Sequence, residues 1–186
     1  MNAIVQTGSG HKAAAAQTAA EKTQYLTFML GGEVLAIGIL AIREIIEYGS
    51  LTTVPMMPTC IRGVINLRGA VVPVMDLSAR FGKRSSEVTK RTCIVIVEMD
   101  VDGEHRDMGV IVDAVNAVLE IAPSDIEPAP SFGANIRTEF IAGMGKVNNN
   151  FVILLNVDNV LSTDEIVALS EPAPSVQAHT PVALAA

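Results

Sequence analysis

The chain has 186 residues, of which 49% are hydrophobic and only 4% aromatic, and its formal net charge is −7. This length is sufficient for one domain or two small ones, with a core built mainly from aliphatic side chains. The negative charge argues against nucleic-acid binding, which needs clustered Lys and Arg. The longest apolar run, Val34 to Ile42, is far shorter than the ~20 residues that span a bilayer. Because the first 22 residues also lack a signal-peptide pattern, the sequence predicts a soluble cytoplasmic protein without direct membrane contact.

Both ends of the chain are rich in small and polar residues and have little apolar surface to bury. We therefore expect disordered tails over residues 1–22 and 171–186, on either side of a folded region over 23–170. Inside that region, short apolar segments alternate with Gly and Pro turn signals, which favours a mainly β fold, either a small barrel or a sandwich. We expect two subdomains, one in each half of the chain, with a boundary near residues 85–91.

The folded region begins with a predicted β-hairpin. Its strands are Tyr25–Leu30 and Val34–Ile39, and Gly31-Gly32 forms the turn between them. A short helix is predicted next, because isoleucines at positions 42, 45 and 46 have helical spacing and Gly49 can end the helix.

Residues 61–77 place an amide and a guanidinium among β-forming apolar residues. Two extended segments, Val64–Arg68 and Ala70–Met75, are joined by a tight turn. Because side chains alternate along a strand, Asn66 is expected to point from the same face as Arg68. Asp76 is predicted to cap a short helix that ends at Gly82.

The second half of the chain continues with strands and turns. Thr92–Glu98 is predicted to be a strand buried on both faces, and Asp102-Gly103 a turn that leads into Asp107–Val115. Asn148–Asn150 marks another hairpin turn. Ser162, followed three residues later by Glu, forms a capping box that predicts a last helix ending near residue 169.

The patterns of metal and histidine-based catalytic sites are not evident in the sequence. The three histidines, at positions 11, 105 and 179, fall in a tail, a hairpin and a tail, so they suggest neither a metal site nor a catalytic dyad. Asp100, Asp102 and Glu104 do not follow the spacing of a calcium-binding loop, and we interpret them as a solvated hairpin tip.

Two further features also have structural interpretations. Gly143-Met144-Gly145 is an isolated G-x-G pattern, which we interpret as a turn at the edge of a strand. Cys60 and Cys93 lie in apolar surroundings without metal-ligand spacing, so we expect buried, reduced thiols. The sequence therefore predicts no enzymatic activity and no bound metal or cofactor.

One run of residues has a recognisable signature. Asn66-Leu67-Arg68-Gly69 and the residues up to Leu77 resemble the N-L-R-G-x-V-x-P-x-x-D-L signature of the CheW family, the scaffold proteins of bacterial chemotaxis arrays. Further segments resemble segments of the family and follow one another in the same order as they do there: Tyr25–Phe28, Leu35–Ile39, Ile42–Ile45, Gly109–Asp113, Pro128, Phe140–Gly143 and Ile153–Asn156. The resemblance covers about Gln24 to Leu169. It implies two SH3-like five-stranded β-barrels packed through a hydrophobic seam, with a few short helices and a C-terminal helix.

The resemblance also implies a function. It predicts a non-enzymatic, cytoplasmic adaptor that couples methyl-accepting chemoreceptors to the histidine kinase CheA. The adaptor would bind the cytoplasmic tip of the receptors and the CheW-like regulatory domain of CheA, without a cofactor, and would meet the membrane array only through these partners.

The resemblance assigns partner binding to particular residues. It implies that Arg68 and Glu44 contact a partner, with Asn66 beside them, and that Ile39 and Ile42 line the groove for the receptor. Taken without the resemblance, the two charged residues could equally form an ordinary surface ion pair or stay separately solvated.

Two alternatives remain open from the sequence. One is a CheW-like module of another chemosensory pathway, such as a CheV-type or surface-motility adaptor. The other is a β-barrel that senses a small molecule directly, which would need an enclosed pocket with convergent polar groups.

Overall fold

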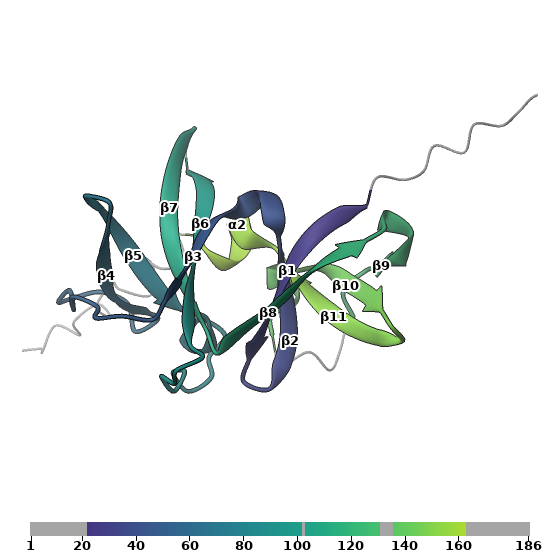
Figure 1. Ribbon diagram of the computed structural model, residues 1–186, viewed down its shortest axis with the longest axis horizontal. Helices are drawn as coiled ribbons and strands as arrows, with labels where there is room; N and C mark the ends of the chain where they lie inside the picture. The colour runs from purple at the N-terminus through teal and green to yellow at the C-terminus, as the bar shows by residue number, and fades with distance from the viewer. Residues whose placement is uncertain (1–21, 102, 131–135, 163–186) are drawn as a thin grey trace, which may run out of the picture.

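The computed structural model describes residues 22–101, 103–130 and 136–162. This part of the chain is mainly β, with strands gathered in two sheets and a few short helices between them (Figure 1). The strands are β1 Thr23–Leu30, β2 Glu33–Gly38, β3 Ile42–Glu47, β4 Ile61–Leu67, β5 Ala70–Asp76, β6 Cys93–Val101, β7 Glu104–Val112, β8 Ala114–Ile121, β9 Ile126–Glu127, β10 Ile141–Val147 and β11 Asn150–Leu155. The helices are α1 Leu77–Arg80 and α2 Val157–Val160, with 3-10 turns η1 Ile39–Ala41, η2 Pro123–Asp125 and η3 Thr138–Phe140.

The two sheets take strands from both halves of the sequence. The smaller sheet has the order β3-β6-β7-β5-β4, and the larger has the order β8-β1-β2-β11-β10-β9. Neighbouring strands are antiparallel except for β5 with β7 and β2 with β11. The predicted mainly β fold is confirmed, although the larger sheet has six strands rather than five. The expected boundary near residues 85–91 falls between β5 and β6, which lie in the same sheet.

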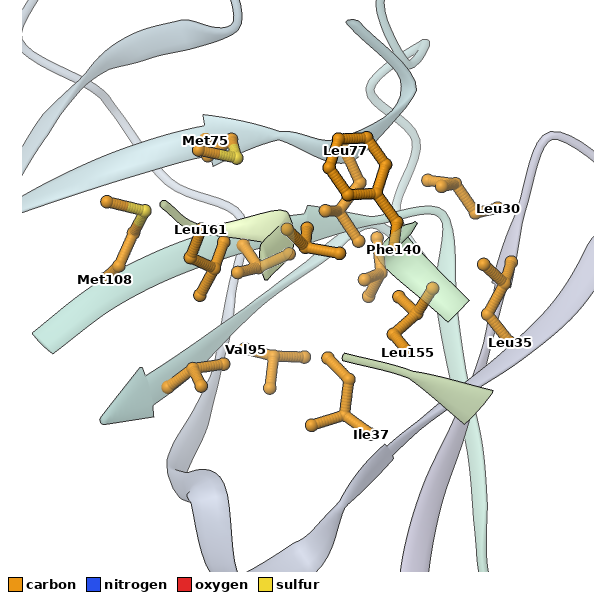
Figure 2. Packing of buried hydrophobic residues seen from close by; sticks show 14 of the residues in the cluster. Leu30, Leu35, Ile37, Met75, Leu77, Val95, Met108, Phe140, Leu155 and Leu161 are labelled. Atoms are coloured by element: carbon orange, nitrogen blue, oxygen red, sulfur yellow. The ribbon is translucent and has the colours of Figure 1, made fainter. Parts of the chain in front are cut away.

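A large apolar cluster fills the space between the two sheets. Ile37 and Leu155 reach it from the larger sheet, Met75 and Val95 reach it from the smaller one, and Phe140 packs among them (Figure 2). This cluster is the seam predicted between two packed β units, and we call it the seam cluster.

Each sheet also has an apolar cluster of its own. Ala36 and Leu154 belong to the cluster of the larger sheet, and Ile94 and Ile96 to that of the smaller sheet. Because side chains alternate along a strand, β6 sends Val95 to the seam cluster and its two neighbours to the other face. The prediction that Thr92–Glu98 contains a strand buried on both faces is therefore confirmed for β6.

One supersecondary unit occurs twice. β4, β5 and α1 form the first hairpin unit, and β10, β11 and α2 form the second, with residue numbers 80 higher. Both units carry the same register shift, between Ile61 and Gly63 in the first and between Ile141 and Gly143 in the second. In both, a backbone hydrogen bond ties the residue before the helix to the residue before the first strand: Asp76 N to Cys60 O at 2.8 Å and Asn156 N to Phe140 O at 2.9 Å.

The helix predicted from the isoleucines at positions 42, 45 and 46 is wrong. These residues form β3, which pairs in antiparallel fashion with β6. Alternate residues of β3 are half-buried and exposed, which is the pattern of a strand. Isoleucine is β-branched and favours strands, so the tertiary pairing prevails over a spacing that fits both structures.

Other expectations have mixed outcomes. The hairpin turns at Gly31-Gly32 and Asn148-Asn149 are confirmed. Gly143-Met144-Gly145 lies inside β10 rather than in a turn. The two glycines are needed there because neighbouring residues come close; a Cβ on Gly143 would lie 2.7 Å from Cγ2 of Ile126. The last helix predicted near residues 162–169 lies outside the described residues. Among the residues described, no helix is long and apolar enough to cross a membrane.

Candidate functional site

The first hairpin unit presents Arg68 at the tip of its turn. Leu67 pairs with Ala70, so Arg68 and Gly69 form a two-residue turn, with φ angles of 53° and 92°. The Oδ1 atom of Asn66 accepts a hydrogen bond from Gly69 N at 2.8 Å. Asn66 therefore shapes the turn, and the expectation that it shares a strand face with Arg68 is wrong, because Arg68 belongs to the turn.

Arginine is an unfavourable residue for this conformation. Two-residue hairpin turns with both φ angles positive favour Asn-Gly or Gly-Gly. A side chain with a Cβ costs roughly 1–2 kcal/mol in the left-handed region. The Arg68 side chain is nevertheless 81% exposed, so it does not recover this cost by packing. Folding alone does not account for an arginine at this position.

Arg68 forms an ion pair with Glu44. Its Nη2 atom lies 2.9 Å from Oε2 of Glu44, whose side chain is 26% exposed. Glu44 lies on β3 and Arg68 follows β4, and these strands are the two edges of the smaller sheet. An exposed ion pair stabilises a fold by only ~0–1 kcal/mol. The two charges are thus held together on the surface, where a partner can reach them.

A close backbone contact supports the same edge of the sheet. The chain between β3 and β4 pairs with β4 through Thr52 and Val64. A Cβ on Gly63 would lie only 2.4 Å from the backbone oxygen of Thr52, so no other residue fits without movement of the backbone. Gly63 therefore acts in backbone geometry, as Gly69 does in the turn.

The isoleucines predicted to bind a partner lie at the margin of the seam cluster. Ile39 and Ile42 are half-buried and pack against this cluster. Leu40, between them, is 95% exposed, and Val118 on the edge strand β8 is 47% exposed. Val118 stands opposite Leu26, which belongs to the seam cluster. We call Ile39, Leu40, Ile42 and Val118 the apolar margin.

Leu40 and Val118 were not among the predicted site residues. An apolar side chain in a strand-rich sequence is normally part of the core, and nothing in the local pattern marks these two as exposed. Their exposure depends on how η1 and the edge strand β8 sit in the folded chain. No sequence signal could have identified them without the fold.

Arg43, the residue before Glu44, has a structural partner. Nη1 of Arg43 lies 2.8 Å from both carboxylate oxygens of Asp107, and this hydrogen bond and the negative charge raise the pKa of the Arg43 guanidinium. The two cysteines differ in burial. Cys60 is buried as predicted, and burial raises the pKa of its thiol, but Cys93 is partly exposed. Within the described ranges, no three His, Cys, Asp or Glu residues come together as a metal site.

Comparisons with known proteins find one domain family and several similar proteins. The CheW-like domain family matches residues 24–165. The chemotaxis protein CheW of Klebsiella aerogenes is 32% identical over 152 residues, which cover 82% of this chain and 89% of that protein. CheW of Rhizobium meliloti is 32% identical over 142 residues, which cover 76% and 89%. The crystal structure of the scaffolding protein TtCheW from Thermoanaerobacter tengcongensis is 34% identical with a TM-score of 0.66, and the match covers 73% of this chain and 85% of that one.

Proposed function

This chain belongs to the CheW family, and we propose that it couples methyl-accepting chemoreceptors to the histidine kinase CheA in the cytoplasm. The family consists of non-catalytic chemotaxis adaptors, so the protein acts by binding rather than by chemistry. The observation that carries the proposal is the family match, which spans both hairpin units and the Arg68–Glu44 pair.

The two surfaces of the candidate site suit two different partners. The apolar margin suits the apolar face of a helix, such as the helical hairpin at the receptor tip. The Arg68–Glu44 pair suits a protein surface with complementary charges, which we assign to the CheW-like regulatory domain of CheA. Arginine is enriched among residues whose truncation weakens an interface most. Asn66 serves this surface indirectly, by fixing the turn that carries Arg68.

Simultaneous binding of the receptor and the kinase would allow the adaptor to couple them. A receptor and a kinase bound to the same small protein are held at a high effective concentration relative to each other. If the two receptor states bind this assembly with different free energies, the receptor state biases the kinase by the same coupling free energy. No group on the adaptor needs to react.

Calorimetric titration of the full chain tests the proposal. We expect the protein to bind a receptor cytoplasmic fragment and the CheA regulatory domain separately, and to bind one in the presence of the other. Failure to bind either partner would overturn the adaptor function. Competition between the two partners for one surface would overturn the assignment of separate surfaces.

The Arg68→Ala variant tests the role of the charged pair. We expect its affinity for CheA to fall about 30-fold, which corresponds to ~2 kcal/mol, while the melting temperature stays near that of the native protein. Arg106→Ala is a matched control, because Arg106 is also exposed and pairs with a glutamate, Glu104, 3.1 Å away. Unchanged affinity together with a much lower melting temperature would show that Arg68 is a structural residue.

A further inference from the structure

The loop between α1 and β6 carries an unusual share of the positive charge. Lys83, Arg84, Lys90 and Arg91 are four of the thirteen Lys and Arg residues of a chain with a net charge of −7. They form two dipeptides that are separated in the sequence, so they do not stand out as a cluster there. We call residues 83–91 the basic loop.

Three of these cations line the same open pocket. Arg84, Lys90 and Arg91 border a space of about 880 Å³, together with the β1–β2 turn and the start of β8. All three are exposed, and none forms an ion pair with another residue in the described part of the chain. Lys83 differs, because its Nζ atom lies 2.9 Å from Oε2 of Glu33. Three like charges that line one pocket without direct ion pairs repel one another, and a negative ligand would relieve this repulsion.

Hydrogen bonds hold the basic loop in place. The backbone N of Ser86 donates to Oδ2 of the buried Asp76 at 3.0 Å, and Ser86 Oγ donates to Ser78 Oγ at 3.1 Å. Further along, the backbone N of Thr89 donates to Oγ1 of Thr92 at 2.8 Å. The loop is thus tied down beside each cation pair, which reduces the entropy that a ligand must remove on binding.

The same hydrogen bonds indicate the chemistry of the ligand. A phosphate site is usually built from backbone N–H groups, but the N–H groups of Ser86 and Thr89 in this loop are already used. Glu87 and Asp113 also line the pocket, so a ligand must place its negative groups against the cations and away from these two carboxylates; Asp113 is held by Gly31 N at 2.7 Å. Separate, exposed cations match carboxylates that are spaced along a chain. We propose that this pocket binds an acidic segment, rich in Asp and Glu, of a protein partner.

Fluorescence anisotropy with labelled hexaglutamate and the full chain tests this proposal. We expect saturable binding that weakens as salt is added, because exposed charges are screened. Replacement of all three cations, Arg84→Glu, Lys90→Glu and Arg91→Glu, should weaken binding at least about tenfold. A control with two charge reversals replaces Lys22 and Lys146 with Glu, since these lysines likewise have no ion pair among the described residues, and it should retain most of the affinity. The pocket variant that changes the net charge by the same amount is Lys90→Glu with Arg91→Glu, and it should bind more weakly than this control.

Three outcomes would overturn the proposal. The first is no binding of hexaglutamate at low salt, and the second is equal affinity in the triple variant and the control. The third is binding of pyrophosphate, a DNA oligonucleotide or phosphatidylglycerol vesicles at this pocket without binding of hexaglutamate. If the triple glutamate variant does not fold, the milder Arg84→Gln, Lys90→Gln and Arg91→Gln variant replaces it, and circular dichroism confirms that it is folded.

Discussion

The two hairpin units share a backbone but differ in the charges they carry. The register, the bulge and the short helix after the second strand are the same in both. The turn of the first unit holds Arg68, where the second has Asn148, and the helix cap of the first is Asp76, where the second has Asn156. The backbone pattern is therefore a requirement of the fold, whereas the charges of the first unit need a separate explanation.

The turns make the contrast clearest. Asn148 and Asn149 adopt φ angles of 47° and 65°, which Asn tolerates better than most residues. Arg68 adopts a φ angle of 53° without that tolerance. The second unit thus has turn residues that suit its conformation, whereas the first has an arginine that does not.

The largest expected difference between the units is at the helix caps. Asp76 is fully buried, accepts hydrogen bonds from Ser78 N and Ser86 N, and pairs with Arg62 at 3.1 Å. We expect Asp76→Ala to lower the free energy of unfolding by about 3–5 kcal/mol, because it leaves buried partners unsatisfied. Asn156→Ala should cost only about 1 kcal/mol, as loss of an ordinary cap does. Urea denaturation of both variants gives the two values.

The Asp76→Asn variant refines this comparison. It gives the first unit the residue type found at the cap of the second, so the cap can form while the charge beside Arg62 is lost. We expect a free energy of unfolding between those of the native protein and Asp76→Ala. Equal losses of unfolding free energy in Asp76→Ala and Asn156→Ala would contradict the view that Asp76 stabilises buried partners in addition to capping its helix.

A second difference is expected at the bulge glycines. A Cβ on Gly63 would meet a backbone oxygen at 2.4 Å, and the φ angle of Gly63 is 150°. A Cβ on Gly143 would meet a methyl group of the Ile126 side chain at 2.7 Å, which can move more easily, and the backbone oxygen of Glu127 only at 3.0 Å. We expect Gly63→Ala to cost roughly 2–3 kcal/mol and Gly143→Ala roughly 1 kcal/mol less. Thermal unfolding measures both, and a reversed order would show that the side chain of Ile126 cannot yield.

Local signals in the sequence predicted much of the fold. Gly31-Gly32, Asn148-Asn149 and the Asp76 cap act within a few residues, so their effects could be identified from the sequence. The duplication of the hairpin unit could not, because Ile, Gly and Val at positions 61, 63 and 72 are the only residues of the first unit repeated in the second. The exchange of strands between the sheets depends on contacts between residues distant in the sequence, which leave no periodic trace.

The candidate site was predicted in part. The sequence identified Glu44 and Arg68, and the structure brings them into contact. It missed Leu40 and Val118, because an apolar residue has the same local signal whether it ends up buried or exposed. The partner-binding role of these residues remains a prediction.

The smallest effect on stability is expected at the turn residue itself, Arg68 in the first unit and Asn148 in the second. Exchanging these residue types distinguishes a role in folding from a role in binding. Arg68→Asn gives the first turn the residue type of the second, which removes the backbone cost and the ion pair together. Because exposed ion pairs contribute ~0–1 kcal/mol and the backbone cost is roughly 1–2 kcal/mol, we expect the free energy of unfolding to rise slightly. Asn148→Arg should lower it by the full backbone cost of roughly 1–2 kcal/mol, since the new arginine would have no Glu44 beside it to offset that cost.

Binding should respond in the opposite sense to stability. Urea denaturation gives the stability of both variants, and titration with the CheA regulatory domain gives their affinities. We expect Arg68→Asn to be the more stable variant and the weaker binder, and Asn148→Arg to be less stable and to bind as the native protein does. If Arg68→Asn lost stability and kept its affinity, the ion pair would serve the fold. The opposite result would mean that the first hairpin unit keeps an unfavourable turn residue because a partner needs it.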